Sequence, residues 1–202
     1  MSSDLEVLKL DWGLRNVQVA RVIKEKEREI GESISFEEWY YEYSHYSSFQ
    51  SNSLKAIFLA IHASFESQLK ILCTFLDKYY NDISNSFKEP DGDKIEKYIA
   101  YFIKRFKHDK EFKEHAVQRK HITFLRNQIM HNDSTINKQK SRSEFRWINE
   151  NSSLSLIHNS LEHDKIYKIE IISSLFITDY LNIINKIFVV IFKEVLHLKK
   201  AQ

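Results

Sequence analysis

The chain has 202 residues, of which 43% are hydrophobic, and its formal net charge is +2 at pH 7. This length suits one domain, or one domain with an extension, and it can bury a sizeable core. With only three Gly and one Pro, the sequence is poor in the turn residues that all-β folds require, so helices are expected. Cys73 is the single cysteine, which excludes an intrachain disulfide and favours a reducing compartment.

The chain shows no clear targeting or membrane segment. Residues 1–13, MSSDLEVLKLDWG, contain acidic residues and no long apolar run, so no secretory signal is expected. A membrane-spanning helix needs about 20 predominantly apolar residues. The most apolar stretch, residues 169–192, is interrupted by Asp179, Asn182, Asn185 and Lys186. We therefore interpret this stretch as protein core and expect a soluble, cytoplasmic protein without a membrane partner.

Charge is unevenly distributed along the chain. Residues 94–146 contain 14 Lys and Arg against 6 Asp and Glu, a local charge of +8, so the remainder carries −6. A basic segment in a near-neutral chain is a modest indication of an anionic partner, nucleic acid included. The alternative interpretation is a solvated helix face.

Hydrophobic periodicity predicts four or five helices, the first over about residues 5–30. Ser35 and Glu38 have the spacing of a capping box, so a second helix is expected to begin there. The aromatic cluster at residues 39–49 is interpreted as packing rather than as a ligand cage. The clearest helix runs from about residue 53 to residue 80, with apolar residues at three- and four-residue steps: Leu54, Phe58, Ile61, Phe65, Leu72, Phe75 and Tyr79.

A turn is predicted at residues 88–93, KEPDGD, because Pro and Gly are unfavourable inside a helix. Two helices are expected after it, over about residues 94–106 and 110–132. The polar segment STINKQKSRS, residues 134–143, is predicted to be a mobile loop.

The pattern changes after this loop. Residues 144–149 and 153–158 are predicted as short strands around an Asn- and Ser-rich turn. Residues 165–171 alternate and indicate a third strand or the beginning of the last helix. That helix is expected over about residues 172–198, with one apolar stripe: Phe176, Tyr180, Ile184, Ile187, Ile191, Val195 and Leu198.

Together these elements predict a mainly all-α fold. We expect an up-and-down helical bundle over residues 51–202, with a small β-hairpin inserted before the last helix. Residues 1–50 are expected to form an N-terminal helical extension.

Several kinds of active site are disfavoured by the residue pattern. The nine histidines form no HxxxH pair and no HExxH motif, and one cysteine excludes a thiolate-rich zinc site. Ser64 and Ser67 lie in a helical pattern without a nucleophile elbow, and no Gly-rich phosphate loop is present. We therefore expect no acyl transfer, no nucleoside-triphosphate hydrolysis, no metal site and no cofactor.

One stretch, FLRNQIMHND at residues 124–133, concentrates polar groups that suit phosphodiester cleavage. A histidine such as His131 can take or give a proton near neutral pH. Arg126 can stabilise the extra negative charge of a pentacovalent phosphorus, and Asn127 can orient the imidazole or the phosphate. Lys120 lies on the same polar side of the predicted helix and is a candidate substrate-binding residue.

The directions of two of these residues argue for a dimer. Asn127 and His131 share a helix face, but Arg126 and His131 are expected to point about 140° apart on an ideal helix. A symmetric dimer would remove this difficulty, because each pocket could take its arginine and histidine from both chains.

Residues 126–131, RNQIMH, resemble the R-x4-6-H signature of HEPN domains, in the form with Asn directly after Arg. Arg126 and His131 are the only pair with this spacing, and the other Arg-Asn pair, at residues 15–16, has Ala20 in place of the histidine. HEPN domains are helical bundles that often act as metal-independent ribonucleases in toxin–antitoxin, phage-defence and RNA-processing systems.

The order of the predicted helices is also similar to the HEPN layout over about residues 51–202. An amphipathic helix containing SFESQLKIL precedes the motif, which lies near the end of a long helix, and an apolar helix follows. Glu66 resembles the acidic residue often found on the earlier helix. The resemblance does not extend to the first 50 residues.

The resemblance implies a homodimeric endoribonuclease that needs no metal or cofactor. A ribose 2′-hydroxyl would attack the adjacent phosphate, leaving a 2′,3′-cyclic phosphate and a 5′-hydroxyl end. His131 would be the general acid/base, Arg126 the transition-state cation and Asn127 a positioning residue. The implied partners are RNA, a second copy of the chain, and an antitoxin or other regulatory protein.

Two alternative functions remain open. A non-catalytic HEPN module would bind RNA or a protein partner through the basic helix and give a complex without cleavage products. A structural helical adaptor would depend on the aromatic segment 36–49 and would be indifferent to changes at Arg126 and His131.

Overall fold

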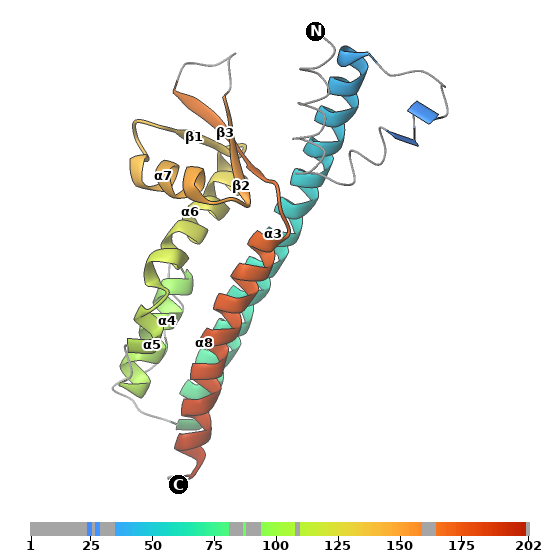
Figure 1. The fold of residues 1–202 in the computed structure, drawn as a ribbon. Coiled ribbons are helices and arrows are strands. Elements are labelled where there is room, and N and C mark those ends of the chain that lie inside the picture. Colours follow the sequence, from blue (N-terminus) through green and yellow to red (C-terminus); the bar gives the residue numbers. More distant parts are fainter. Residues whose placement is uncertain are drawn as a thin grey trace. The chain divides into compact units, whose positions relative to one another are not determined.

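The computed structural model describes residues 24–25, 27–28, 35–80, 87, 94–107, 110–158 and 165–200. Within these residues the protein is mostly helical, with six helices and one three-stranded antiparallel sheet (Figure 1). The predominance of helix is therefore confirmed. The chain divides into two compact units, Met1–Ser53 and Leu54–Gln202, and the candidate site belongs to the second.

Helix α3, Phe36–Tyr80, is one long helix where the sequence predicted two. It begins directly after Ser35, as the capping-box spacing indicates, and continues through the aromatic segment without a break. From residue 54 onward, its apolar residues at three- and four-residue steps are buried in the core: Phe58, Phe65, Leu69, Cys73 and Leu76. The predicted helix at residues 5–30 lies outside the described residues, except for the helical positions 24–25 and 27–28.

Helix α4, Lys94–Phe106, has the predicted bounds, but the single helix predicted at 110–132 is wrong. The structure instead has a short helix α5, Lys110–Lys113, and the motif-bearing helix α6, Ala116–His131. Residues 114–115 form a turn between them.

A buried arginine accounts for this break. Arg119 is only 4% exposed, and its Nη1 donates to the carbonyl oxygen of Phe112 at 2.7 Å. In an unbroken α-helix that carbonyl would accept the N–H of Ala116 instead. The same guanidinium donates through Nε and Nη2 to the Glu96 carboxylate on α4, at 2.7 and 3.2 Å. The tertiary contact between α4 and α6 therefore replaces a backbone hydrogen bond.

The sheet has the strand order β1-β3-β2 and is antiparallel throughout. Strands β2, Leu154–His158, and β3, Ile166–Ile171, form an antiparallel pair before the last helix, at the positions predicted as strands 153–158 and 165–171. The predicted hairpin of 144–149 with 153–158 is not the one that forms. Strand β1, Thr135–Asn137, lies in the segment predicted to be a mobile loop. That prediction is wrong, because this segment pairs with the other edge of β3 and buries Ile136.

The strand predicted at 144–149 is also wrong, because helix α7 spans Arg142–Glu150. Phe145, Arg146 and Trp147 alternate in polarity over three positions, which resembles a strand. Ile148 breaks that alternation, and a helix places it one turn from Phe145 on the inner side. Ile148 is fully buried.

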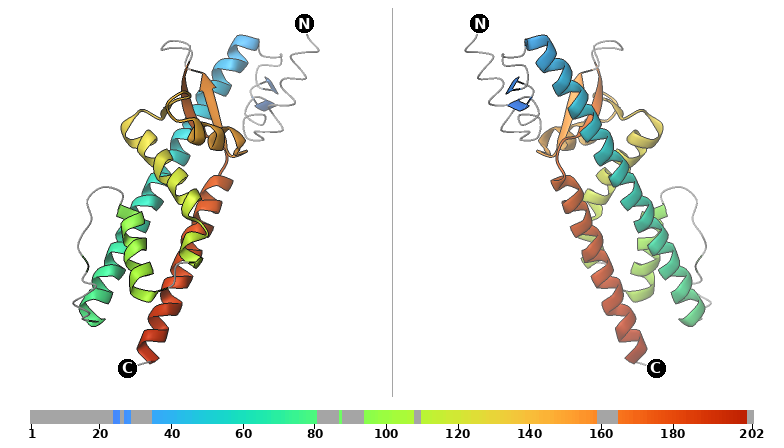
Figure 2. Two further views of the ribbon diagram at one scale, coloured as in Figure 1. Left: turned by 90° about the vertical axis from the view of Figure 1, so that its left-hand side faces the viewer. Right: turned by 90° about the vertical axis from the view of Figure 1, so that its right-hand side faces the viewer.

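Helix α8, Leu175–Lys200, runs alongside the part of α3 that belongs to the second unit (Figures 1 and 2). Phe58 packs on Phe176 with ring centroids 5.5 Å apart, and Phe65 packs on Phe188 at 5.6 Å. Because residue numbers rise together in both pairs, the two helices are parallel. Much of the predicted stripe of α8 is buried: Phe176, Tyr180, Ile184, Ile187 and Ile191.

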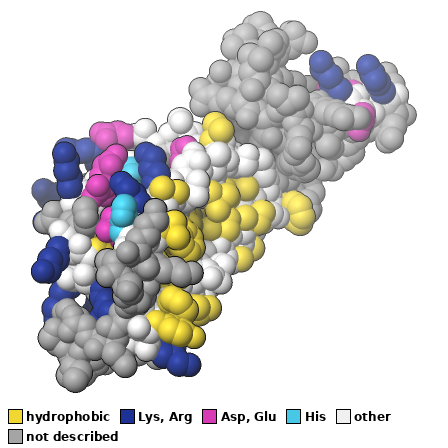
Figure 3. Space-filling view, turned by 90° about the horizontal axis from the view of Figure 1, so that it is seen from below, with side chains coloured by type: hydrophobic (Ala, Val, Ile, Leu, Met, Phe, Trp, Pro, Cys, Tyr) yellow, Lys and Arg dark blue, Asp and Glu magenta, His cyan; other side chains and the backbone are white. Residues whose placement is uncertain are grey.

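Both helices also carry apolar side chains on their exposed sides, and hydrophobic side chains gather beside charged ones in Figure 3. Among the described helices, Ser48–Tyr79 and Leu175–His197 are long and apolar enough to cross a membrane. Their most apolar windows are 28% and 33% buried. Length and composition alone do not separate a membrane span from the core helix of a soluble protein. The expected absence of a membrane partner stays a prediction.

Candidate functional site

Helix α6 presents the RNQIMH motif at its C-terminal end. Ile122 and Leu125 are buried and attach the helix to the core. Arg126 is half-buried, whereas Asn127 and His131 are exposed. The motif therefore lies where a buried face of the helix meets solvent.

The three motif side chains meet within one chain. Arg126 Nη1 donates to Asn127 Oδ1 at 2.9 Å and lies 3.5 Å from His131 Nε2. A guanidinium carries only donors, so a hydrogen bond between the two would need Nε2 as its acceptor. The expectation that Arg126 and His131 point too far apart to meet within one chain is therefore wrong. It considered only the directions in which the two residues leave the helix, and the arginine side chain is long enough to reach the imidazole. A second chain is not required to bring Arg126 and His131 together.

The end of α6 is held by an unusual turn. Asp133 and Ser134 have positive φ values of 49° and 61°, in the left-handed region that non-glycine residues rarely adopt. The N–H of Ser134 donates to the carbonyl of Gln128 at 2.9 Å, and its own carbonyl accepts from the N–H of Ile169 at 2.7 Å. This turn ties the end of the motif helix to strand β3 and fixes the position of His131.

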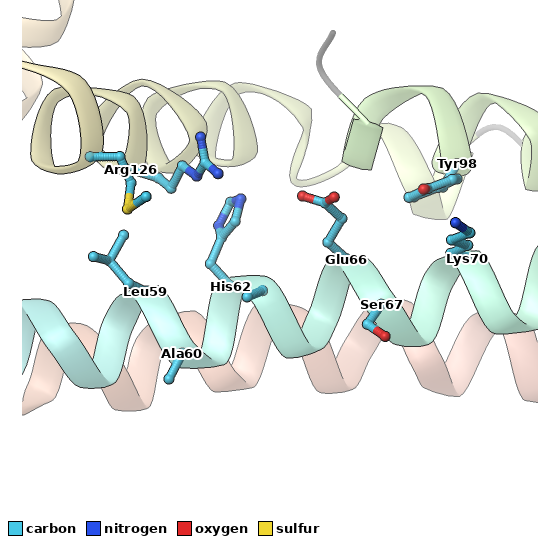
Figure 4. Close-up of a pocket in the computed structure, with 10 residues that line it drawn as sticks. Leu59, Ala60, His62, Glu66, Ser67, Lys70, Tyr98 and Arg126 are labelled. Atoms are coloured by element: carbon cyan, nitrogen blue, oxygen red, sulfur yellow. The ribbon is translucent and has the colours of Figure 1, made fainter. Parts of the chain in front are cut away.

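A pocket of about 530 Å³ lies beside the motif, between α3, α4 and α6 (Figure 4). His62 and Glu66 extend from α3 into the pocket and Lys70 extends toward Tyr98 on α4, while Arg126 extends from α6 toward α3. The lining residues are Leu59, Ala60, His62, Ala63, Glu66, Ser67, Lys70, Tyr98, Arg126 and Met130. Two residues proposed from the sequence, Arg126 and Glu66, thus share one pocket, and His131 is linked to it through Arg126.

His62 is the pocket residue that sequence reasoning missed. Its Nδ1 is 2.9 Å from the phenol oxygen of Tyr180 on α8, and the residue is only 4% exposed. Burial, with a smaller contribution from the positive charge of Arg126, lowers the pKa of His62 to about 4. The sequence signal was its position one turn before Glu66 and one turn after Phe58, which places it between the pocket and the core.

The charges around Tyr180 complete the electrostatics of the pocket. Burial raises the pKa of the Tyr180 phenol, and the negative charge of Glu66 raises it further. The pocket therefore contains a neutral imidazole at neutral pH, which the neutral phenol of Tyr180 contacts from α8, beside the side chains of Arg126, Lys70 and Glu66.

Lys120 is exposed on α6 and is not among the residues that line the pocket. Its role in binding a substrate stays a prediction. Asn127 is likewise outside the lining and reaches the pocket only through its hydrogen bond with Arg126.

Within the part of the chain that the structure describes, no three His, Cys, Asp or Glu residues are grouped as a metal site would require. Comparisons with protein-family models, with curated proteins and with solved structures found no match to this chain. The functional interpretation therefore depends on the chemistry of the motif and the pocket.

Proposed function

We propose that this chain is a metal-independent endoribonuclease of the HEPN type. The observation that carries the proposal is the contact of Arg126 with both Asn127 and His131 in one chain, next to a pocket. It supplies a phosphate-binding cation and a titratable base within a few ångströms, which phosphodiester cleavage needs. The RNQIMH motif and the order of the helices around it support the same assignment.

The proposed reaction balances with these side chains alone. The 2′-oxygen of a ribose forms a bond to the adjacent phosphorus, and the bond from phosphorus to the 5′-oxygen of the next nucleotide breaks. His131 Nε2 takes the 2′-hydroxyl proton and then donates it to the departing 5′-oxygen, leaving a 2′,3′-cyclic phosphate and a 5′-hydroxyl. Arg126 stabilises the additional negative charge that develops on the phosphoryl oxygens.

The resting contacts of Arg126 fit this sequence of events. The guanidinium lies 3.5 Å from Nε2 of His131, the nitrogen that takes the proton in this reaction. Asn127 Oδ1 accepts from the same Nη1 and orients the guanidinium. When a phosphate binds Arg126, the guanidinium exchanges its contact with Nε2 for phosphate oxygens and leaves the imidazole beside the substrate.

Charge around the site supports an RNA substrate. Arg126 and Lys70 both line the pocket, and α6 belongs to the basic segment 94–146. Neutralised phosphates contribute strongly to nucleic-acid binding. We propose RNA as the substrate, a cytoplasmic location, and a toxin or phage-defence role with an antitoxin or other regulatory partner.

Single and double substitutions test the proposal. Arg126→Ala and His131→Ala should each remove most cleavage of a labelled RNA, by about 10²–10⁴-fold for the histidine. The double variant should lose little more, because the two side chains serve one transition state. Arg146→Ala is the matched control, since it removes one exposed positive charge from the same basic segment outside the pocket.

The product ends and the binding data separate the alternatives. Cleavage should yield 2′,3′-cyclic phosphate ends, and RNA binding should weaken more for Arg126→Ala than for His131→Ala. A wild-type protein that binds RNA without cutting it would identify a non-catalytic module. Folded variants that cut at the wild-type rate would reject the assignment of both residues.

The same comparison can be made in cells. Expression of the wild type in a bacterium should slow growth and degrade RNA, whereas His131→Ala should do neither at equal protein level. Equal toxicity of the two proteins, with intact RNA, would indicate a different activity.

A further inference from the structure

The imidazole of His62 occupies the pocket beside Arg126, yet no step of the proposed reaction uses it. The ring extends from α3 toward the helix that carries Arg126 (Figure 4). It is almost completely buried, and its Nδ1 contacts the Tyr180 phenol at 2.9 Å. Because Nδ1 of His62 already contacts Tyr180, only Nε2 is left to form a hydrogen bond with a ligand.

The partner of Nδ1 determines which nitrogen carries the proton. The Tyr180 phenol is buried, and its hydroxyl must donate to some acceptor if it is not to lose a hydrogen bond. Nδ1 of His62 is the acceptor that the contact provides. A Tyr180 hydroxyl that donates to Nδ1 leaves the imidazole proton on Nε2.

The groups around His62 favour its neutral form. Arg126 on α6 places a positive charge on the ligand side, Tyr180 on α8 is neutral, and Tyr98 on α4 also lines the pocket. Glu66 and Lys70 follow His62 along α3 and carry opposite charges. A second cation at His62 would be desolvated and repelled by Arg126, so the ring keeps a single, fixed proton.

We propose that His62 is a hydrogen-bond donor that binds a phosphate oxygen of the RNA held by Arg126, and that Tyr180 is the positioning residue that fixes its tautomer. This inference rests on the proposed function, since it assigns a role in the same site. His131 and His62 then have different roles in the reaction. His131 exchanges protons with the substrate, whereas His62 presents one preorganised donor to the charge that develops in the transition state.

A long-range ¹H–¹⁵N NMR spectrum of the RNA-free protein tests the tautomer directly. The His62 signals, assigned by their loss in His62→Gln, should show a protonated Nε2 and an unprotonated Nδ1, unchanged from pH 7.5 to pH 5.5. In Tyr180→Phe this preference should weaken. A proton on Nδ1, or titration of His62 near pH 6.5, would overturn the proposal.

Inorganic phosphate tests the ligand contact without any assay of cleavage. Phosphate added to the wild type should shift the His62 Nε2–H signal, and the shift should be lost in Arg126→Ala. The exposed His197, which lies outside the pocket, serves as the control signal. A His62 signal that responds no more than that of His197 would also overturn the proposal.

Kinetics then tests the contribution to the reaction. His62→Phe should lower kcat by about 10²–10³-fold, the effect typical of removing one oxyanion donor, with little change in KM. His62→Gln, whose amide can still donate, should recover most of the loss, and His197→Gln should behave as the wild type. If His62→Phe does not fold, the phosphate titration of the wild type and Arg126→Ala decides whether His62 contacts the phosphate.

The outcomes separate this inference from the proposed function. A wild type that does not cut RNA but shows the phosphate-dependent shift would reject the function and keep the donor assignment. A wild type that cuts RNA while His62→Phe retains its kcat would reject the donor and keep the function.

Discussion

Arg126 connects the motif with the pocket through three effects of one side chain. It donates to Asn127, contacts His131 and, through its charge, helps to lower the pKa of His62. A lysine could not replace it, because a single ammonium lacks the planar fork that reaches neighbours in several directions. Loss of Arg126 should therefore disturb both histidines as well as phosphate binding.

At the residue scale, we predict that His62 destabilises the protein in acid. Its pKa is about 4 in the folded protein against an ordinary value of 6.5, so the unfolded chain binds more protons between these pH values. The free energy of unfolding should fall as pH drops through this window, by about 3 kcal/mol at roughly 1.4 kcal/mol per pH unit. Urea unfolding of the wild type and His62→Gln at several pH values measures the difference.

Other acidic and basic groups change the stability of both proteins with pH, so the comparison between them is decisive. The variant cannot be protonated at position 62 and should lose less stability from pH 6.5 to pH 4. Parallel pH profiles would show that His62 does not have a depressed pKa.

At the scale of elements, the position of α6 depends on Arg119 more than on helix propensity. We predict that Arg119→Ala lowers the free energy of unfolding by about 2–3 kcal/mol. It would leave the Phe112 carbonyl without its donor and remove the ion pair with Glu96. Arg119→Lys should cost less, since it keeps the charge but cannot make all three hydrogen bonds. Chemical unfolding followed by circular dichroism gives both values, and a loss below 0.5 kcal/mol for Arg119→Ala would contradict this account.

A homodimer with the motif helices facing each other stays a prediction at the same scale. Val117 on α6 is 68% exposed and Phe192 on α8 is 52% exposed. If the dimer forms through α6, Val117→Glu should give a monomer and Phe192→Glu should leave the dimer intact. Light scattering at micromolar concentration measures the mass of each. The reverse result would move the interface to α8, and a wild-type monomer that cuts RNA would show that the dimer is unnecessary.

At the scale of the whole molecule, the proposed reaction uses side chains alone and should need no divalent metal. We predict that RNA cleavage continues in excess EDTA at an unchanged rate. An unstructured RNA substrate removes the effect of metal ions on RNA folding. Activity that disappears with EDTA and returns with a divalent ion would contradict the mechanism.

Helices whose apolar side chains repeat at regular spacing could be predicted from the sequence. Helices α4 and α8 and the part of α3 in the second unit follow from that periodicity, because burying one apolar stripe stabilises a helix wherever it packs. The RNQIMH motif is likewise visible without a structure. Its residue types alone indicated one general acid/base, the histidine, and one cation, the arginine.

Tertiary structure decided the features that depend on a partner distant in sequence. Arg119 interrupts a predicted helix because Glu96 and Phe112 hold its guanidinium, and β1 is a strand because β3 offers an edge for hydrogen bonding. His62 became part of the site because α6 and α8 bring Arg126 and Tyr180 to it. Hydrophobic periodicity indicates which face of an element is buried, but it does not indicate which side chains of other elements contact that face.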